Sequence, residues 1–201
     1  MLEKLKSLFA AVFIAMMLGL VVWAPDAAAR NTIPSLGAGP YEIIMYSDYF
    51  CPPCNRIDAK AEPLLKELLA TGKVKLTFVD VPFHKETPLY VRVYLYAANA
   101  GPTDEEVFRI RRVLFTAAQE KRIDDREALL AYVKEQKVTW RAFNEKPVFS
   151  MLSASIKQNK VDETPTCIIR YSPTEVEKYG GTDEIWDGLI KLKAYLAMMK
   201  R

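Results

Sequence analysis

The chain has 201 residues, of which 50% are hydrophobic and 26% are charged, and this balance suits one globular domain with a substantial core. The formal net charge is only +3, and the Lys and Arg residues are spread along the sequence rather than clustered. The composition therefore excludes the basic surface that nucleic-acid binding needs, and we expect no nucleic-acid partner.

The N-terminal segment has the layout of a secretory signal peptide. Two lysines among the first six residues form a basic start, residues 8–24 are an apolar run, and 27–29 are small residues where a signal peptidase can cut. We therefore predict a signal peptide over 1–29, cleavage near Ala29, and a periplasmic or otherwise exported mature protein. Because the apolar run is of borderline length for spanning a bilayer, an uncleaved membrane anchor is the alternative.

The first elements of the mature chain form a strand, a helix and a strand. Short runs of β-forming residues at 41–47 and 74–81 enclose a helical pattern from Cys54 to about residue 70. This connection is long enough for a parallel crossover. Pro63 lies inside the helical pattern and should kink or divide the helix, and Gly72 should end it.

The segment 85–159 is predicted to be almost wholly helical. Four helices are expected, at about 88–100, 103–117, 124–136 and 148–159. Thr103 followed by Glu106 resembles a capping box at the start of the second. The remaining predicted elements are two strands and a last helix with Thr182 as its N-cap, at 166–171, 176–179 and 182–199.

The cysteines carry the strongest chemical signal. Two of the three, Cys51 and Cys54, enclose Pro52 and Pro53 at the junction between the first strand and its helix. At a helix start, the helix dipole and free N–H groups favour a thiolate, so Cys51 is the candidate nucleophile. Two intervening residues let the sulfurs meet in a disulfide, and we predict that Cys54 resolves the mixed disulfide formed at Cys51.

Other roles for these residues stay open. A structural disulfide of this spacing closes a very small loop and would constrain the unfolded chain little. A zinc site usually takes four ligands, and the chain has three Cys and one His. A metal-binding or metallochaperone module using Cys51, Cys54 and either Cys167 or His84 is the alternative from a different class. His84 itself is either a base near the cysteines or a loop histidine without a catalytic role.

The element order and two short segments together resemble a known family. A strand leads into 49–54 (YFCPPC), and 163–166 (ETPT) enters a distant strand. This combination resembles the DsbA-type branch of the thioredoxin superfamily over nearly all of the mature chain. The resemblance implies an α/β fold, with a thioredoxin-like domain at 30–84 and 160–201 and a helical insertion at 85–159.

The resemblance also implies how substrate is bound. Pro165 would be a cis proline facing the cysteine pair, and the backbone of Thr164 would pair with an extended substrate segment. The alternative is an ordinary trans proline that opens an edge strand. Tyr49 and Phe50, next to the motif, are expected to offer an apolar docking surface for unfolded chains.

Two positions bear on the direction of the reaction. Met45 stands where many relatives have a buried carboxylate, and Pro53 stands where strongly oxidising relatives have a histidine. Both departures leave the direction open.

Cys167 follows Pro165 by two residues, and strand alternation predicts that it is a buried thiol, with a third redox thiol as the alternative.

The resemblance thus implies thiol–disulfide exchange on unfolded or cysteine-containing exported proteins, with no cofactor or metal and with a membrane redox partner. We predict a disulfide donor, with a reductase or an isomerase as the alternative. Isomerase relatives carry an N-terminal dimerisation domain, and only a short leader precedes the first predicted strand here, so we expect a monomer.

Overall fold

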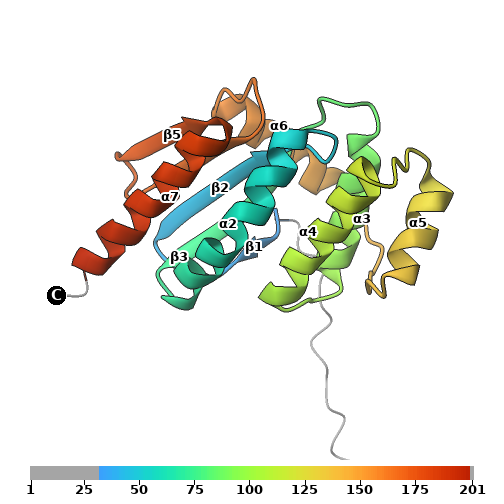
Figure 1. Ribbon diagram of the computed structural model, residues 1–201, viewed down its shortest axis with the longest axis horizontal. Helices are drawn as coiled ribbons and strands as arrows, with labels where there is room; N and C mark the ends of the chain where they lie inside the picture. Colours follow the sequence, from blue (N-terminus) through green and yellow to red (C-terminus); the bar gives the residue numbers. More distant parts are fainter. Residues whose placement is uncertain (1–31, 200–201) are drawn as a thin grey trace, which may run out of the picture.

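A mixed five-stranded sheet organises residues 32–199, the part of the chain that the computed structural model describes (Figure 1). The strand order is β1-β3-β2-β4-β5. The strands are β1 (Ser35–Leu36), β2 (Tyr41–Ser47), β3 (Val74–Asp80), β4 (Thr166–Arg170) and β5 (Val176–Gly180). β2 and β3 are parallel and the other pairs are antiparallel, as expected for a crossover connection between the first two long strands. The predicted signal peptide at 1–29 lies outside the described residues.

Helices cover both faces of the sheet, and others lie beside it. They are α2 (Pro52–Ala70), α3 (Thr87–Asn99), α4 (Asp104–Gln119), α5 (Arg126–Glu135), α6 (Lys146–Gln158) and α7 (Gly181–Met198). Figure 1 shows α2 and α7 in front of the sheet, α6 behind it, and α3, α4 and α5 beside it. Because α3 to α6 all lie between β3 and β4 in the sequence, the predicted α/β fold with a helical insertion is confirmed.

Prolines and a glycine set the limits of α2. Pro52 and Pro53 occupy its first positions, where a helix needs no N–H from them and their fixed φ favours the helical backbone. Pro63, which was expected to kink or divide the helix, lies inside it without dividing it. Both Pro63 and Ala59, one turn earlier, are exposed, so water can reach the carbonyl that the proline leaves without a donor. Gly72, at φ +68°, ends the helix as predicted.

One strand was not predicted, and one predicted helix cap is wrong. The two-residue strand β1 pairs with β3. It was not predicted because the segment around it is rich in Pro and Gly. Thr182 does not cap the last helix: Gly180 is the N-cap, and its N–H donates to the Glu184 carboxylate at 3.1 Å. The capping box of Thr103 and Glu106 is present at the start of α4. Within residues 32–199, no helix has a stretch long and apolar enough to cross a membrane.

Candidate active site

Cys51 and Cys54 form a disulfide where β2 ends and α2 begins, with their Cα atoms 5.3 Å apart. Cys51 is the N-cap of α2 and Cys54 lies in its first turn, as the sequence predicted. Cys51 is 8% exposed and Cys54 is completely buried. The two cysteines are therefore not equivalent, because only Cys51 has exposed surface that an incoming thiolate can reach.

The helix start offers few hydrogen-bond donors to Cys51. Pro52 and Pro53 have no N–H group, so the first N–H of α2 belongs to Cys54. This N–H lies 3.3 Å from the Cys51 sulfur and 3.0 Å from the Cys51 carbonyl oxygen. The Asn55 N–H also donates to that carbonyl, at 3.3 Å. One backbone donor is thus shared between the sulfur and the carbonyl of the same residue.

The loop before β4 faces the disulfide. The peptide bond between Thr164 and Pro165 is cis, as the family resemblance implied. The sulfur of Cys51 lies 3.5 Å from the carbonyl oxygen of Thr164. Thr164 is half-buried, whereas Pro165 is buried and its own carbonyl accepts from the Gly181 N–H at 2.9 Å. The structure therefore brings together all the predicted site residues at one end of the sheet.

A buried carboxylate that the sequence analysis missed anchors the loop before Cys51. Asp48 is completely buried and accepts from the N–H groups of Phe50 at 2.8 Å and of Phe83 and His84 at 3.1 Å each. It also accepts from the Thr87 hydroxyl at 2.9 Å. Asp48 thus ties the loop that carries the cysteines to the loop between β3 and α3. The hydrogen bond from the Phe50 N–H, two residues after Asp48, closes a local turn that aspartate side chains favour. An aspartate directly after a strand was the signal that the sequence offered for this turn.

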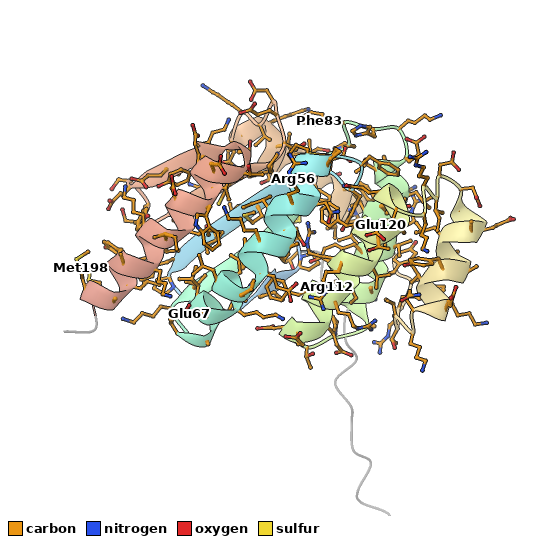
Figure 2. All side chains as sticks on the ribbon, in the orientation of Figure 1. Arg56, Glu67, Phe83, Arg112, Glu120 and Met198 are labelled. Atoms are coloured by element: carbon orange, nitrogen blue, oxygen red, sulfur yellow. A yellow bond between two sulfur atoms is a disulfide. The ribbon has the colours of Figure 1, made fainter. Side chains whose placement is uncertain are left out.

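His84 belongs to this anchor rather than to the disulfide. Its Nδ1 atom lies 3.0 Å from the second Asp48 oxygen, and its ring centre lies 5.8 Å from that of Phe50. The side chain is 48% exposed, and its described partners are these two residues. Figure 2 shows the neighbouring Phe83 on the same side of the molecule as Arg56, which follows Cys54 by two residues in α2.

A buried arginine of the helical insertion lies beneath the redox loop, residues 48–51 between β2 and α2. Arg111 of α4 is completely buried, and its guanidinium donates to Asp58 of α2 at 2.9 Å, to Asp80 of β3 at 3.3 Å and to the Ser47 hydroxyl at 2.8 Å. It also lies 3.5 Å from the Tyr49 hydroxyl. Because Tyr49 is completely buried in this cluster, the expectation that it forms an exposed docking surface is wrong.

The charges of this cluster depend on one another. Burial raises the pKa of both Asp58 and Asp80, and the adjacent Arg111 guanidinium opposes that shift. Burial by itself would lower the pKa of Arg111, but Asp58 and its other acidic neighbours raise it well above the usual value. The arginine is therefore charged, and it is the cation that makes two buried carboxyl groups tolerable.

Cys167 is a buried thiol, as predicted. It is completely buried and lies in register with Met45 of β2 and Tyr179 of β5. The Tyr179 ring packs against Gly188 of α7, where an added Cβ would lie 2.6 Å from it, so this face of the sheet is the one covered by α2 and α7. Burial raises the pKa of the Cys167 thiol well above its usual value. Met45, 3% exposed, lies on the same face.

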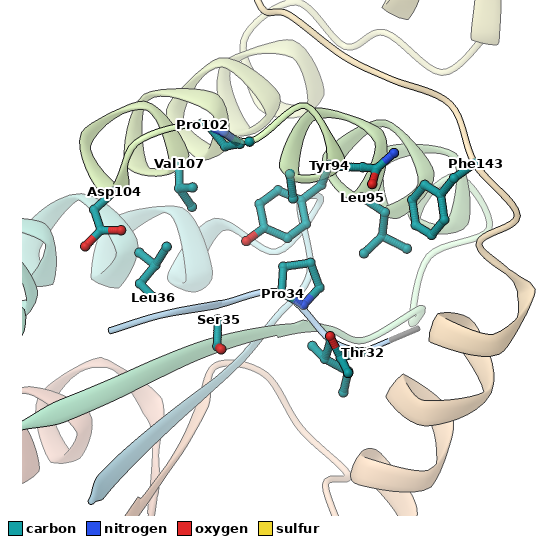
Figure 3. A pocket seen from close by; sticks show the side chains of 14 residues that line it. Thr32, Pro34, Ser35, Leu36, Tyr94, Leu95, Pro102, Asp104, Val107 and Phe143 are labelled. Carbon is teal, nitrogen blue, oxygen red and sulfur yellow. The ribbon is translucent and has the colours of Figure 1, made fainter. Parts of the chain in front are cut away.

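A cavity of about 450 Å³ lies away from this site (Figure 3). It is bounded by residues 32–36, by α3 and α4 and by Phe143, and its lining includes none of the cysteines and neither Thr164 nor Pro165. In residues 32–199, no three His, Cys, Asp or Glu side chains are grouped so that they could hold a metal ion.

Comparisons with known proteins agree with this geometry. A family model described as thioredoxin matches residues 37–179. Among solved structures, the chain is similar to alpha-DsbA1 of Wolbachia pipientis, with a TM-score of 0.61, 18% identity, and coverage of 84% of this chain and 94% of that chain. It is also similar to a periplasmic thioredoxin-like protein from Salmonella enterica serovar Typhimurium, with a TM-score of 0.58, 19% identity, and coverage of 80% and 88%. The catalytic domain of Proteus mirabilis ScsC gives a TM-score of 0.60 at 18% identity, with coverage of 82% and 89%.

At these identities the structural likeness concerns the fold, and for the fold the predicted DsbA-type resemblance is confirmed. No curated protein matches the sequence.

Proposed function

Because the chain belongs to the thioredoxin family and carries a Cys-x-x-Cys disulfide opposite a cis-proline loop, we propose that it exchanges disulfides with cysteine-containing proteins. The observation that carries this proposal is the position of the Cys51 sulfur, 3.5 Å from the Thr164 carbonyl oxygen and at the start of α2. A substrate segment that pairs with the backbone of Thr164 would bring its own cysteine to that sulfur.

The reaction with a reduced substrate has two steps. A substrate thiolate attacks the Cys51 sulfur, the bond to Cys54 breaks, and its electron pair goes to the Cys54 sulfur, which takes up a proton. A second substrate thiolate then attacks the substrate sulfur of the mixed disulfide, and Cys51 leaves as a thiolate. The substrate loses two electrons and two protons, and the protein disulfide becomes a dithiol.

The leaving Cys51 thiolate is favoured by its place in the fold. It sits at the positive end of α2, a helix that spans Pro52–Ala70, and the Cys54 N–H lies 3.3 Å from it. Both features stabilise negative charge on sulfur and hence the reduced form of the pair. This supports a disulfide donor, because a protein gives up its disulfide when its own dithiol form is more stabilised than the dithiol form of its substrates.

We place this donor outside the cytoplasm, as a monomer that acts on unfolded exported proteins and is re-oxidised by a membrane redox partner. The support is the signal-peptide pattern at 1–29, since disulfides form and persist in exported compartments. A reductase or isomerase is the alternative within the same chemistry, because the same pair would run in reverse if a partner supplied electrons.

The test is transfer of the disulfide to a reduced model peptide with two cysteines. The oxidised protein should form close to one peptide disulfide per protein, and Cys51→Ser should form none. Metal analysis of the same preparation addresses the metallochaperone alternative. Stoichiometric copper or zinc on the protein, without disulfide transfer to the peptide, would overturn the redox proposal in favour of metal binding.

A further inference from the structure

One face of α4 holds the segment that leads into the redox pair. Arg111, Phe115 and Gln119 follow one another at four-residue spacing, which places them on the same side of the helix. Arg111 bonds the Ser47 hydroxyl, and the Phe115 ring centre lies 5.1 Å from that of Tyr49. The stripe therefore follows the chain from the end of β2 toward the disulfide, and its last member, Gln119, comes closest to it.

The side-chain amide of Gln119 donates hydrogen bonds to two backbone carbonyls of the redox loop. Its Nε2 donates to the Tyr49 carbonyl at 2.9 Å and to the Cys51 carbonyl at 3.0 Å. Its Oε1 accepts from the Asn55 side-chain amide at 3.4 Å. This arrangement fixes the orientation of the Gln119 amide, because a flipped amide would turn its oxygen toward two carbonyl oxygens. Figure 2 shows Glu120, the next residue, displaced along α4 from Arg112 toward the end of the molecule that carries Arg56.

We propose that Gln119 is a positioning residue of the redox pair, through which the helical insertion sets the equilibrium between its disulfide and dithiol forms. This inference rests on the proposed exchange reaction. Gln119 does not touch the sulfur of Cys51 in this arrangement; it acts through the carbonyl of that residue.

The physical reason is competition for one donor. The Cys54 N–H lies within reach of both the Cys51 sulfur and the Cys51 carbonyl oxygen, and the two prolines before it supply no other N–H. A carbonyl oxygen has two lone pairs. The Gln119 amide and the backbone N–H of Asn55 both donate to this oxygen, so it competes less strongly for the Cys54 N–H that it shares with the sulfur. The Cys54 N–H can then stabilise a thiolate on Cys51. Without Gln119, the Cys51 carbonyl oxygen loses a donor and draws the Cys54 N–H away from the sulfur. The partial negative charge on that oxygen is then also less compensated.

Gln119→Met tests this idea, because it keeps the length of the side chain and removes both polar groups. The exposed Gln158 at the end of α6 provides the matched control, Gln158→Met. Each protein is equilibrated with glutathione buffers, and the rate of Cys51 alkylation in the reduced protein is followed against pH. We expect Gln119→Met to lower the equilibrium constant for oxidation of glutathione about tenfold, equivalent to about 30 mV for a two-electron couple. The alkylation profile should shift to higher pH, and Gln158→Met should match the natural chain.

The outcomes separate this inference from the proposed function. If the natural chain fails to exchange with glutathione at all, the proposed function is wrong. If the natural chain exchanges and Gln119→Met has the same equilibrium constant and the same alkylation profile, Gln119 does not position the redox pair. A loss of stability alone, with both readouts unchanged, likewise overturns the inference, because a merely structural contact would give that result.

Discussion

The sulfur of Cys51 lies 3.5 Å from the carbonyl oxygen of Thr164, although 113 residues separate them in the sequence. Only the fold brings these residues together, because β4 is paired with β2 in the sheet and the cis-proline loop precedes β4 directly. Cys54 is completely buried beneath this contact. The arrangement assigns different roles to the two sulfurs, and each role has a separate test.

Replacing Cys54 with Ala should trap the reverse reaction, in which the reduced pair attacks a substrate disulfide. Cys51 would still form a mixed disulfide with a peptide disulfide, but no second protein thiol would remain to displace the peptide from Cys51. Mass spectrometry of the protein mixed with a peptide disulfide should therefore find a lasting covalent adduct on Cys51. The matched Cys51→Ser protein should form no adduct on the buried Cys54. Equal alkylation rates of the two cysteines in the native reduced protein would contradict this division of roles.

Replacing Arg111 with Met should destabilise the fold strongly. The substitution leaves the carboxyl groups of Asp58 and Asp80 buried without their cation, which typically costs about 3–5 kcal/mol in the free energy of unfolding. The neighbouring Arg112 provides the control, because its pair with Glu62 is partly exposed and such pairs contribute about 0–1 kcal/mol. Urea unfolding of Arg111→Met and Arg112→Met measures both values.

The pH dependence of the Arg111→Met deficit gives a second check. Without the guanidinium, the folded-state pKa of Asp58 and Asp80 rises further above the unfolded value, and a raised carboxyl pKa costs stability as the pH rises through it. The deficit should therefore be smaller at acid pH, where the carboxyl groups hold protons, than at neutral pH. Equal and pH-independent losses for both arginine variants would show that the buried carboxyl groups do not need Arg111.

Replacing Cys167 with Ala should lower stability without lowering exchange activity. The substitution removes a buried sulfur, and at neutral pH we expect a cost of about 1–2 kcal/mol from lost packing. Exchange with a model peptide should be unchanged within about twofold, an allowance equal to about 0.4 kcal/mol. A large loss of exchange at unchanged stability would instead make Cys167 a third redox thiol.

The cost of Cys167→Ala should also shrink at alkaline pH. The native thiol has a raised pKa, whereas in the unfolded chain it ionises near its ordinary value of about 8.5, so the unfolded state releases a proton that the native state keeps. The natural chain should therefore lose about 2 kcal/mol between pH 8 and pH 10 from this group, and the Ala variant should not. Unfolding of both proteins over this range measures the difference, and parallel curves would contradict the assignment.

Separate substitutions of Asp48 and of His84 should distinguish a role in anchoring the loops from a role in catalysis. Asp48→Ala leaves the N–H groups of Phe83 and His84 and the Thr87 hydroxyl without their acceptor, so we expect a loss of about 3 kcal/mol. His84→Ala removes one half-exposed partner and should cost less than about 1 kcal/mol, with exchange retained. Urea unfolding and the peptide assay check both. Exchange lowered tenfold in His84→Ala, with stability intact, would make His84 a base of the reaction.

The local parts of the site were predictable from the sequence. The start of α2 at Pro52, the N-cap position of Cys51 and the burial of Cys167 all follow from nearest neighbours in the chain, since helix starts and strand alternation are local signals. The cis bond before Pro165 was inferred from the resemblance, because no local signal distinguishes it from a trans bond.

The parts that were missed depend on tertiary contacts. Nothing near Arg111 in the sequence shows that it is buried, because its partners Asp58 and Asp80 come from α2 and β3. For the same reason Tyr49 was expected on the surface, although α4 covers it. Gln119 looks like an ordinary last residue of a helix until the fold places its amide on the carbonyls of the redox loop.

The reduction potential of the Cys51–Cys54 pair distinguishes a disulfide donor from a reductase. Equilibration with glutathione buffers, followed by alkylation of free thiols, gives the value. The helix start and the Cys54 N–H favour the Cys51 thiolate, whereas the two prolines remove other donors, so we predict a potential above about −270 mV and below about −120 mV. A potential at or below about −270 mV, the value of the fold's reductants, would contradict a disulfide donor and identify a reductase instead.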